Sequence, residues 1–236
     1  VAVYELQQKL AAKKDLQGLE KKKRIKSDKY FAAVGETQRI FVVEGDSASG
    51  GLIKCLGRKG NAFFALKGVP LNVLEVTHQK FMANKELSEL YTVITTFPDA
   101  EICISTDADA DGSRIRGLLT LFLHKYFPDH FRENKIRILK TPLAIGKKKN
   151  IVQEWAYTFA EVNGINSKLD ISYVKGLGSW SEKDLKLIID KESLEKMLPT
   201  VKIDNADLLY QWFSGSTSEF RKDQIRVAKP FDINGV

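Results

Sequence analysis

Short apolar runs alternate with longer amphipathic stretches in the middle of the chain. Branched and aromatic side chains in the short runs predict buried strands at residues 39–43, 61–66, 102–104 and 136–139. Apolar side chains at helical spacing predict a helix that Gly57 ends, and helices at residues 75–95 and 115–126. Strands that alternate with helices are typical of a parallel sheet flanked by helices. The pattern therefore predicts an α/β fold with a parallel-rich sheet.

The two ends of the chain follow different patterns. Residues 1–32 are polar and predicted to be mainly helical. After Pro142 the pattern predicts a basic hairpin tip at residues 147–150, a strand at residues 171–174, a helix capped by Ser181, and a last helix around residues 208–213. We therefore divide the chain into a helical N-terminal segment (1–34), an α/β domain (35–145) and an α+β C-terminal part (146–236).

Composition limits the classes of protein that fit. With 236 residues, 28% charged and 43% hydrophobic, the chain has the balance of a soluble globular protein of one large or two small domains. It shows no apolar run of membrane-spanning length and no signal peptide, and its first residue, Val, suggests a fragment or a processed chain. The net charge of +7 favours a polyanionic partner. Cys55 and Cys103 lack metal-site spacing and are interpreted as buried free thiols of a reducing compartment.

Three aspartates at alternate positions follow the third predicted strand. Asp107, Asp109 and Asp111 are spaced by alanines and precede Gly112 and a predicted helix. Carboxylates crowded at a strand end repel one another unless a cation holds them, and oxygen ligands suit Mg²⁺. One alternative is an acidic turn that only caps the helix. A calcium EF-hand loop is another, but its twelfth position needs Glu and is Leu118 here.

A second acid stands in a similar place. Glu44 ends the first predicted strand and is followed by Gly45, which permits a tight turn, and by Asp46 or Ser47 as a helix cap. An ordinary strand–turn–helix explains this segment alone. Because the strand–acid–glycine pattern occurs twice, we expect two neighbouring strand ends to supply one metal site.

Four segments then stand in one order along the chain. They comprise residues 44–48, 67–73, 107–112 and 175–178. In this order and spacing the chain resembles the Toprim region of type IIA DNA topoisomerases, found in the B subunits of gyrases and in eukaryotic topoisomerase II. The resemblance covers nearly the whole chain, and residues 111–119 and 173–178 are more similar to the eukaryotic and large-phage versions than to gyrase.

The resemblance implies a metal-dependent reaction on DNA. A tyrosine of a winged-helix partner domain or subunit attacks a DNA phosphodiester, and ATP is bound by an upstream domain outside this chain. Glu44, Asp107 and Asp109 would hold the catalytic Mg²⁺, and Asp111 would help a second ion or orient the ligands of the first. Glu44 would also handle the proton on the 3′-oxygen. The implied assembly is dimeric or heterotetrameric, in the cytoplasm, nucleoid or nucleus, and the isolated chain is expected to be unable to cleave or relax DNA.

The resemblance also implies contacts to DNA. Asp46, Lys67 and Lys175 are the implied contact residues within the motifs. Lys175 would also link the glycine turn at residues 175–178 to the acidic cluster, with a plain turn as the alternative. The basic residues of the N-terminal segment are further candidates, with a solvated linker as the alternative: Lys22, Lys23 and Arg24. Two positions depart from the family pattern, because Arg114 replaces a usual His and Val69 replaces a usual Lys.

Three other functions stay open at this stage. A Toprim primase or overcoming-lysogenisation-type nuclease would keep the two acidic motifs but lack residues 67–73 and 175–178. A non-catalytic, metal-stabilised DNA-binding module would not need Glu44 at its strand end. A phosphoacceptor domain, with an Asp nucleophile, is the third alternative.

Overall fold

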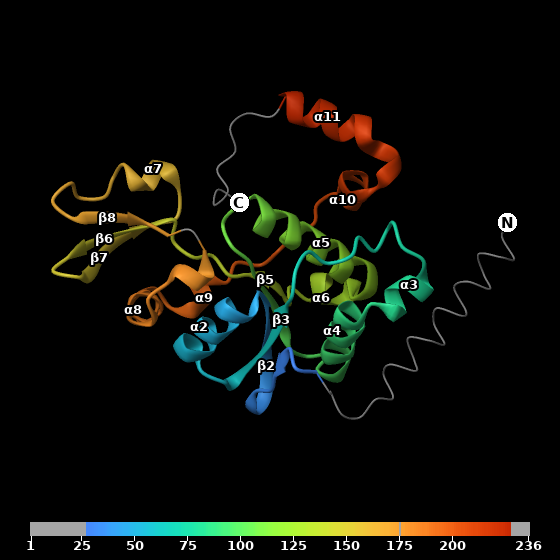
Figure 1. The fold of residues 1–236 in the computed structure, drawn as a ribbon, viewed down its shortest axis with the longest axis horizontal. Coiled ribbons are helices and arrows are strands. Elements are labelled where there is room, and N and C mark those ends of the chain that lie inside the picture. Colours follow the sequence, from blue (N-terminus) through green and yellow to red (C-terminus); the bar gives the residue numbers. More distant parts are fainter. Residues whose placement is uncertain (1–26, 175, 228–236) are drawn as a thin grey trace, which may run out of the picture.

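The computed structural model describes residues 27–174 and 176–227. Its larger sheet has five strands in the order β1-β3-β2-β4-β5 (Figure 1). Strands β2 to β5 are parallel to one another, and only β1 is antiparallel. The predicted parallel-rich α/β fold is therefore confirmed. The strands are β1 (Tyr30–Phe31), β2 (Val34–Glu44), β3 (Lys59–Leu66), β4 (Glu101–Ser105) and β5 (Ile136–Ile138).

Helices cover both faces of this sheet. Alternate residues of β2 point to opposite faces, so that Ile40 and Val42 join one core and Phe41 and Val43 join the other. The first face packs against α3 (His78–Ala83), α4 (Lys85–Thr96), α5 (Ala110–Tyr126) and α6 (Pro128–Arg132). The second packs against α2 (Asp46–Leu56), α8 (Glu182–Glu192) and α9 (Leu194–Met197). Burial on both faces explains why the strands are apolar throughout.

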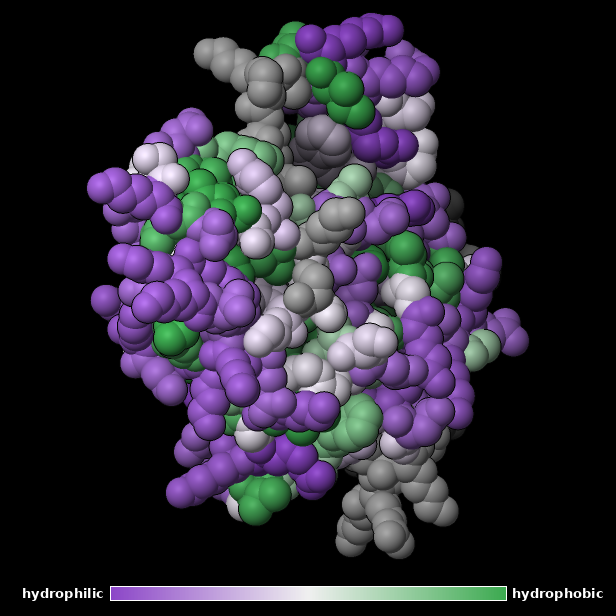
Figure 2. Space-filling view, turned by 60° about the vertical axis from the view of Figure 1, so that its left-hand side comes forward, coloured by the Kyte–Doolittle hydropathy of each residue, from purple (hydrophilic) through white to green (hydrophobic). Residues whose placement is uncertain are grey.

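A smaller antiparallel sheet projects from the α/β domain. Its strands β6 (Ala144–Lys148), β7 (Ile151–Ala156) and β8 (Asp170–Tyr173) lie in the order β7-β6-β8, with α7 (Phe159–Val162) beside them. Lys149 and Asn150 turn the β6–β7 hairpin with φ of 52° and 61°, which confirms the predicted basic tip. Figure 2 brings this side of the molecule forward and shows small apolar patches scattered among hydrophilic side chains.

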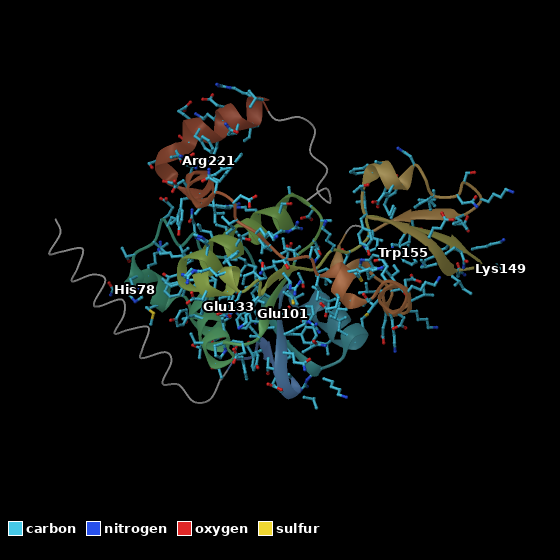
Figure 3. The ribbon with its side chains drawn as sticks, turned by 180° about the vertical axis from the view of Figure 1, so that it is seen from behind. His78, Glu101, Glu133, Lys149, Trp155 and Arg221 are labelled. Atoms are coloured by element: carbon cyan, nitrogen blue, oxygen red, sulfur yellow. The ribbon has the colours of Figure 1, made fainter. Side chains whose placement is uncertain are left out.

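Hydrogen bonds of Arg137 join the larger sheet to the chain that returns from α9. Glu101, which Figure 3 labels, accepts hydrogen bonds from Arg39 and Arg137, and Arg137 also donates to Leu198 O and Thr200 Oγ1. The return leads to α10 (Ala206–Phe213), a 3₁₀ turn (Gly215–Thr217) and α11 (Ser218–Val227). The ring of Phe213 packs against Gly117 of α5, which holds α10 against the domain.

Several boundaries differ from the prediction. Residues 30–31 form β1 beside Phe63 and Phe64 instead of a helix, because strand pairing overrides the polar local pattern. The helix predicted at residues 75–95 is two helices, since Asn84 caps a new one. The helix at residues 206–213 is followed by α11, so it is not the last. Cys103 is buried as predicted, whereas Cys55 is only partly buried.

No helix in the described part of the chain is both long and apolar enough to cross a membrane.

Candidate functional site

The two acidic strand ends meet at one edge of the larger sheet. Strands β2 and β4 are neighbours, paired up to Val43 and Ser105, and Glu44 and Asp107 follow at their carboxyl ends. The chain leaves these two strands toward opposite sides, to β3 and to β5. Such a reversal opens a crevice at the carboxyl edge of a parallel sheet, where ligands bind. This placement explains how residues 63 positions apart come into contact.

Asp107 is the centre of the described site. Its backbone N–H donates to Glu44 Oε2 at 3.2 Å, and its Oδ1 accepts from the Leu177 N–H at 2.7 Å. Three of the four sequence motifs are thereby joined at one residue. The link from the glycine turn is made by a backbone N–H of Leu177, and Lys175, the residue expected to make it, lies outside the described residues.

Two glycines make this arrangement possible. A Cβ on Gly112 would stand less than 3.0 Å from the backbone of Asp107, and a Cβ on Gly176 would stand equally close to its carboxylate. Cβ atoms do not approach other atoms so closely in proteins. These two positions therefore need glycine for close approach. The local pattern around Gly176 indicates only a turn, because this role depends on a contact with Asp107, 69 positions earlier in the chain.

The other aspartates begin helix α5. Asp109 is its N-cap, and Asp109 Oδ1 accepts from the Gly112 N–H at 2.8 Å. Asp111 lies in the first turn and is exposed. Both carboxylates are favoured there by the unpaired N–H groups and the helix dipole. Asp109 thus caps the helix, as the first alternative predicted, and it is also one of the residues expected to bind the metal.

The corresponding cap of α2 differs from the prediction. Gly45, with φ of 83°, is the N-cap, and no side chain caps this helix. Asp46 and Ser47 are instead the first helical residues, and both are exposed. Gly45 is required there because a side chain is strained at positive φ.

The electrostatics of the site are those of crowded negative charge. Burial raises the pKa of Glu44, and the charges of Asp107, Asp109 and Asp111 raise it further, while the hydrogen bond from the Asp107 N–H opposes the shift. Within residues 27–174 and 176–227, however, no three His, Cys, Asp or Glu side chains are arranged to hold a metal ion. The donor chemistry fits Mg²⁺, because all four candidate ligands are carboxylates. The four are close enough to interact electrostatically, but they are not assembled as a ligand set.

Replacing Glu44 by Gln is expected to stabilise the metal-free protein at pH 7. Gln retains an oxygen that can accept from Asp107 but removes the repelling charge. The folded-state pKa of Glu44 lies above its ordinary value of 4.5, so the charged form weakens folding. With about 1 kcal/mol of desolvation and charge repulsion after solvent screening, Tm should rise by about 2–4 °C. Thermal unfolding in EDTA measures this.

The pH dependence supplies the control for Glu44→Gln. Below pH 4.5 Glu44 is protonated in both the folded and unfolded states, so the difference in Tm should disappear as the pH falls through the raised folded-state pKa toward that value. A Tm difference that stays constant from pH 7 to pH 4 would mean that the charge of Glu44 is not its cause.

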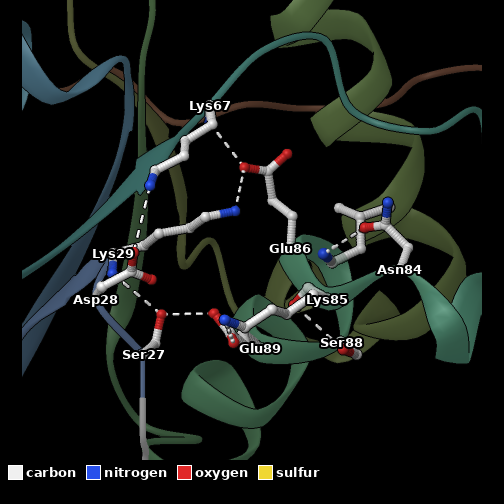
Figure 4. Close-up of polar contacts among 10 residues, drawn as sticks. Ser27, Asp28, Lys29, Lys67, Asn84, Lys85, Glu86, Ser88 and Glu89 are labelled. Carbon is white, nitrogen blue, oxygen red and sulfur yellow. Dashed lines mark hydrogen bonds and ion pairs between the residues drawn. The ribbon is translucent and has the colours of Figure 1, made fainter.

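Lys67 lies beyond the carboxyl end of β3, in a network shown in Figure 4. Its Nζ is 3.3 Å from Asp28 Oδ2, and both side chains are more than half exposed. Its backbone N–H donates to Glu86 Oε1 at 2.7 Å, and the same oxygen accepts from buried Lys29. Glu86 therefore holds the backbone of this segment, whereas the exposed ion pair with Asp28 is weak and leaves the amine accessible.

The remaining candidate residues are either exposed or outside the described part of the chain. Arg114 and Val69, the two departures from the family pattern, are both exposed. The basic candidates Lys22, Lys23 and Arg24 lie outside the described residues. Their proposed contacts to DNA stay predictions.

Comparisons with known proteins relate this chain to the Toprim domain and to DNA topoisomerases and gyrases. Residues 39–139 match the family model described as Toprim domain. The B subunit of DNA topoisomerase 4 from Borreliella burgdorferi is 31% identical over 172 residues, which cover 68% of this chain and 28% of that protein. The B subunit of DNA gyrase from Spiroplasma citri is 30% identical over 208 residues, covering 79% of this chain and 32% of that protein. DNA topoisomerase 2-alpha of Rattus norvegicus is 30% identical over 173 residues, covering 62% of this chain and 11% of that protein.

A solved structure shares the fold. It is the crystal structure of the Plasmodium falciparum topoisomerase II DNA-binding, cleavage and re-ligation domain, with a TM-score of 0.76 and 24% sequence identity. The match covers 88% of this chain and 32% of that one, and the chain spans about a third or less of each of these relatives. Residues 39–139 therefore form a Toprim domain, and the chain is a homologue of the type IIA DNA topoisomerases over the region that contains this domain.

Proposed function

We propose that this chain is the Mg²⁺-binding Toprim portion of an ATP-dependent type IIA DNA topoisomerase. In this role it supports cleavage, passage and religation of double-stranded DNA together with a tyrosine-bearing winged-helix domain or subunit. The observation that carries the proposal is the contact between Glu44 and Asp107 at the carboxyl ends of β2 and β4, with the Leu177 N–H bound to the same aspartate. A fold that only binds DNA does not need acids gathered at this edge.

The four acidic residues would serve two metal ions in the proposed reaction. Glu44, Asp107 and Asp109 would hold the catalytic Mg²⁺, and Asp111 would serve a second ion. The bound metal would neutralise charge on the phosphoryl oxygens and on the leaving 3′-oxygen. Glu44, whose pKa burial and neighbouring charge raise, is suited to hold and return the proton of that oxygen. Leu177 fixes one oxygen of Asp107 and so its orientation.

The proposed partners follow from the same assignment. Double-stranded DNA is the substrate, and Asp46, Lys67 and Lys175 are its proposed contacts within the Toprim motifs. ATP would be bound by a separate upstream domain of a dimeric or heterotetrameric enzyme. The site of action would be the cytoplasm, nucleoid or nucleus.

The β6–β7 tip is expected to add non-specific affinity for DNA. Lys148 and Lys149 are exposed at the end of the hairpin, where Figure 3 labels Lys149. Changing both to Gln removes two cations that can displace counterions from the DNA backbone. The slope of log affinity against log salt should therefore fall by about 1–2, similarly for unrelated duplex sequences. Fluorescence anisotropy at several salt concentrations measures the slope.

Lys147 offers the matched control for the tip. Its Nζ lies 2.6 Å from Oδ2 of buried Asp184, so its charge is used inside the protein. Lys147→Gln should lower stability by about 1 kcal/mol, or Tm by about 2–4 °C, and leave the salt slope nearly unchanged. An equal loss of slope from both changes would contradict a role specific to the exposed lysines.

Reconstitution tests the proposal as a whole. The chain is mixed with a tyrosine-bearing winged-helix subunit of a type IIA enzyme and supercoiled plasmid, and covalent complexes are trapped with detergent. We expect DNA linked to the partner's tyrosine only when the chain and Mg²⁺ are both present. Partner alone, and the mixture in EDTA, are the controls. Cleavage that does not depend on this chain would refute the proposal.

A further inference from the structure

A small cavity lies next to the acidic edge of the sheet. It has a volume of about 130 Å³ and is formed where the ends of β4 and β5 meet the segment that follows α9. This volume is below that of sites for drug-sized ligands and suits a small group. None of the residues that line it is acidic. Its polar and basic lining comprises Thr106, Arg116, Lys140, Thr141, Thr200 and Lys202.

Arg116 is the unusual member of this lining. Its side chain is partly buried on α5, and burial lowers its pKa from the ordinary value. Its Nε donates a hydrogen bond to Thr106 Oγ1 at 3.4 Å, and no carboxylate pairs with it among the described residues. A guanidinium nevertheless stays charged in proteins. Arg116 is therefore a desolvated cation without a compensating anion, which is unfavourable.

The other partly buried arginines of this domain show the contrast. Arg39 and Arg137, with 21% and 23% of their side chains exposed, both bind Glu101. Arg116 lies at the other end of the sheet and faces a cavity instead of a carboxylate. A bound anion in the cavity would supply the negative charge that Arg116 lacks.

We propose that this cavity binds a phosphate group, with the Arg116 guanidinium as its main ligand and the threonine hydroxyls and Lys202 as additional donors. Arginine offers a planar set of donors that matches phosphate oxygens. Thr106 and Ala108 flank Asp107, so the bound group lies beside the acidic edge. The expected source of the bound phosphate group is the DNA backbone near the cleavage site, and this part of the inference rests on the proposed function. Free phosphate is the other source.

Titration with inorganic phosphate tests the cavity without metal or cleavage. The amide signals of Thr106, Thr141 and Thr200 are followed by NMR in the ¹⁵N-labelled chain, at constant ionic strength. We expect saturable shifts, and binding that is roughly tenfold or more weaker in Arg116→Gln, as expected for a charged hydrogen bond. Arg114→Gln is the matched control, because Arg114 is exposed on the same helix and does not line the cavity. It should change the affinity by less than about twofold.

A short DNA duplex distinguishes the two sources. If a backbone phosphate occupies the cavity, the duplex shifts the same three amides and displaces phosphate. If the site is for free phosphate, the duplex and phosphate bind together. Both results require Arg116 and support the proposal. Lys202→Gln, at an exposed edge of the cavity, gives a second and milder loss if Arg116→Gln does not fold.

Two results would overturn the inference. One is the absence of saturable shifts at these amides with both phosphate and duplex. The other is an equal loss of affinity in the Arg116 and Arg114 variants, which would show general attraction to a basic surface. Neither result bears on the proposed function, because that proposal is tested by Mg²⁺-dependent DNA cleavage. Conversely, a failure of the cleavage experiment would leave the result of the phosphate titration unchanged.

Discussion

Replacing Asp109 by Asn in the complex reconstituted with a tyrosine-bearing partner is expected to lower DNA cleavage about 100-fold or more. The change removes one charge from the acids proposed to hold Mg²⁺. It preserves the helix cap, because Asn can accept from the Gly112 N–H as Asp109 does. Losing one group that stabilises developing charge typically lowers a rate by about 100- to 1,000-fold. The rate of covalent complex formation at low Mg²⁺ measures the effect, and DNA affinity should stay within about twofold.

The neighbouring acid provides the control. Asp111→Asn also removes a charge from the first turn of α5, but Asp111 is exposed and is proposed to serve only the second ion. Its loss of cleavage should be smaller, and Mn²⁺ or higher Mg²⁺ should restore part of the activity of Asp109→Asn. Full cleavage by Asp109→Asn at low Mg²⁺ would show that the metal site is misplaced.

Local patterns were sufficient to predict the framework of the site. Apolar runs ending in Glu44 and Asp107 predicted two strand ends at one edge, and the strand order places them side by side. This success has a physical reason, since burial on both faces makes the central strands apolar and parallel strands end at the same edge. The identity of the acids and their glycines then carried the resemblance to the Toprim region.

Contacts between distant segments were not predictable in the same way. Nothing near Leu177 in the sequence indicates that its N–H binds Asp107, and nothing near Lys67 indicates its pairing with Asp28. The cavity at Arg116 also depends on the segment after α9, which returns to cover the ends of β4 and β5. Such contacts depend on how whole elements pack, whereas local periodicity reports only which face of each element is buried.

Replacing Gly176 by Ala is expected to abolish most DNA cleavage while leaving the two cores folded. The added Cβ would stand less than 3.0 Å from the carboxylate of Asp107, so either that side chain or the glycine turn must move. Movement of either would break the bond between Asp107 Oδ1 and the Leu177 N–H and so change the orientation of the carboxylate. Because catalytic groups misplaced by about 1 Å lose about 100-fold in rate, cleavage should fall by at least about that factor. Covalent complex formation measures the loss, and circular dichroism checks the fold.

Gly178→Ala is the matched control in the same turn. A Cβ on Gly178 has nothing within 4 Å in the described structure, and its φ is not positive, so this change tests the turn's tolerance of alanine alone. Cleavage should stay within about threefold of the unmodified complex, as for surface changes that alter stability by no more than about 0.5 kcal/mol. Combining Gly176→Ala with Asp107→Asn should then add little to the loss from Asp107→Asn, because both changes act through one carboxylate. Equal losses from the two glycine variants would show that the turn as a whole, and not its approach to Asp107, supports the reaction.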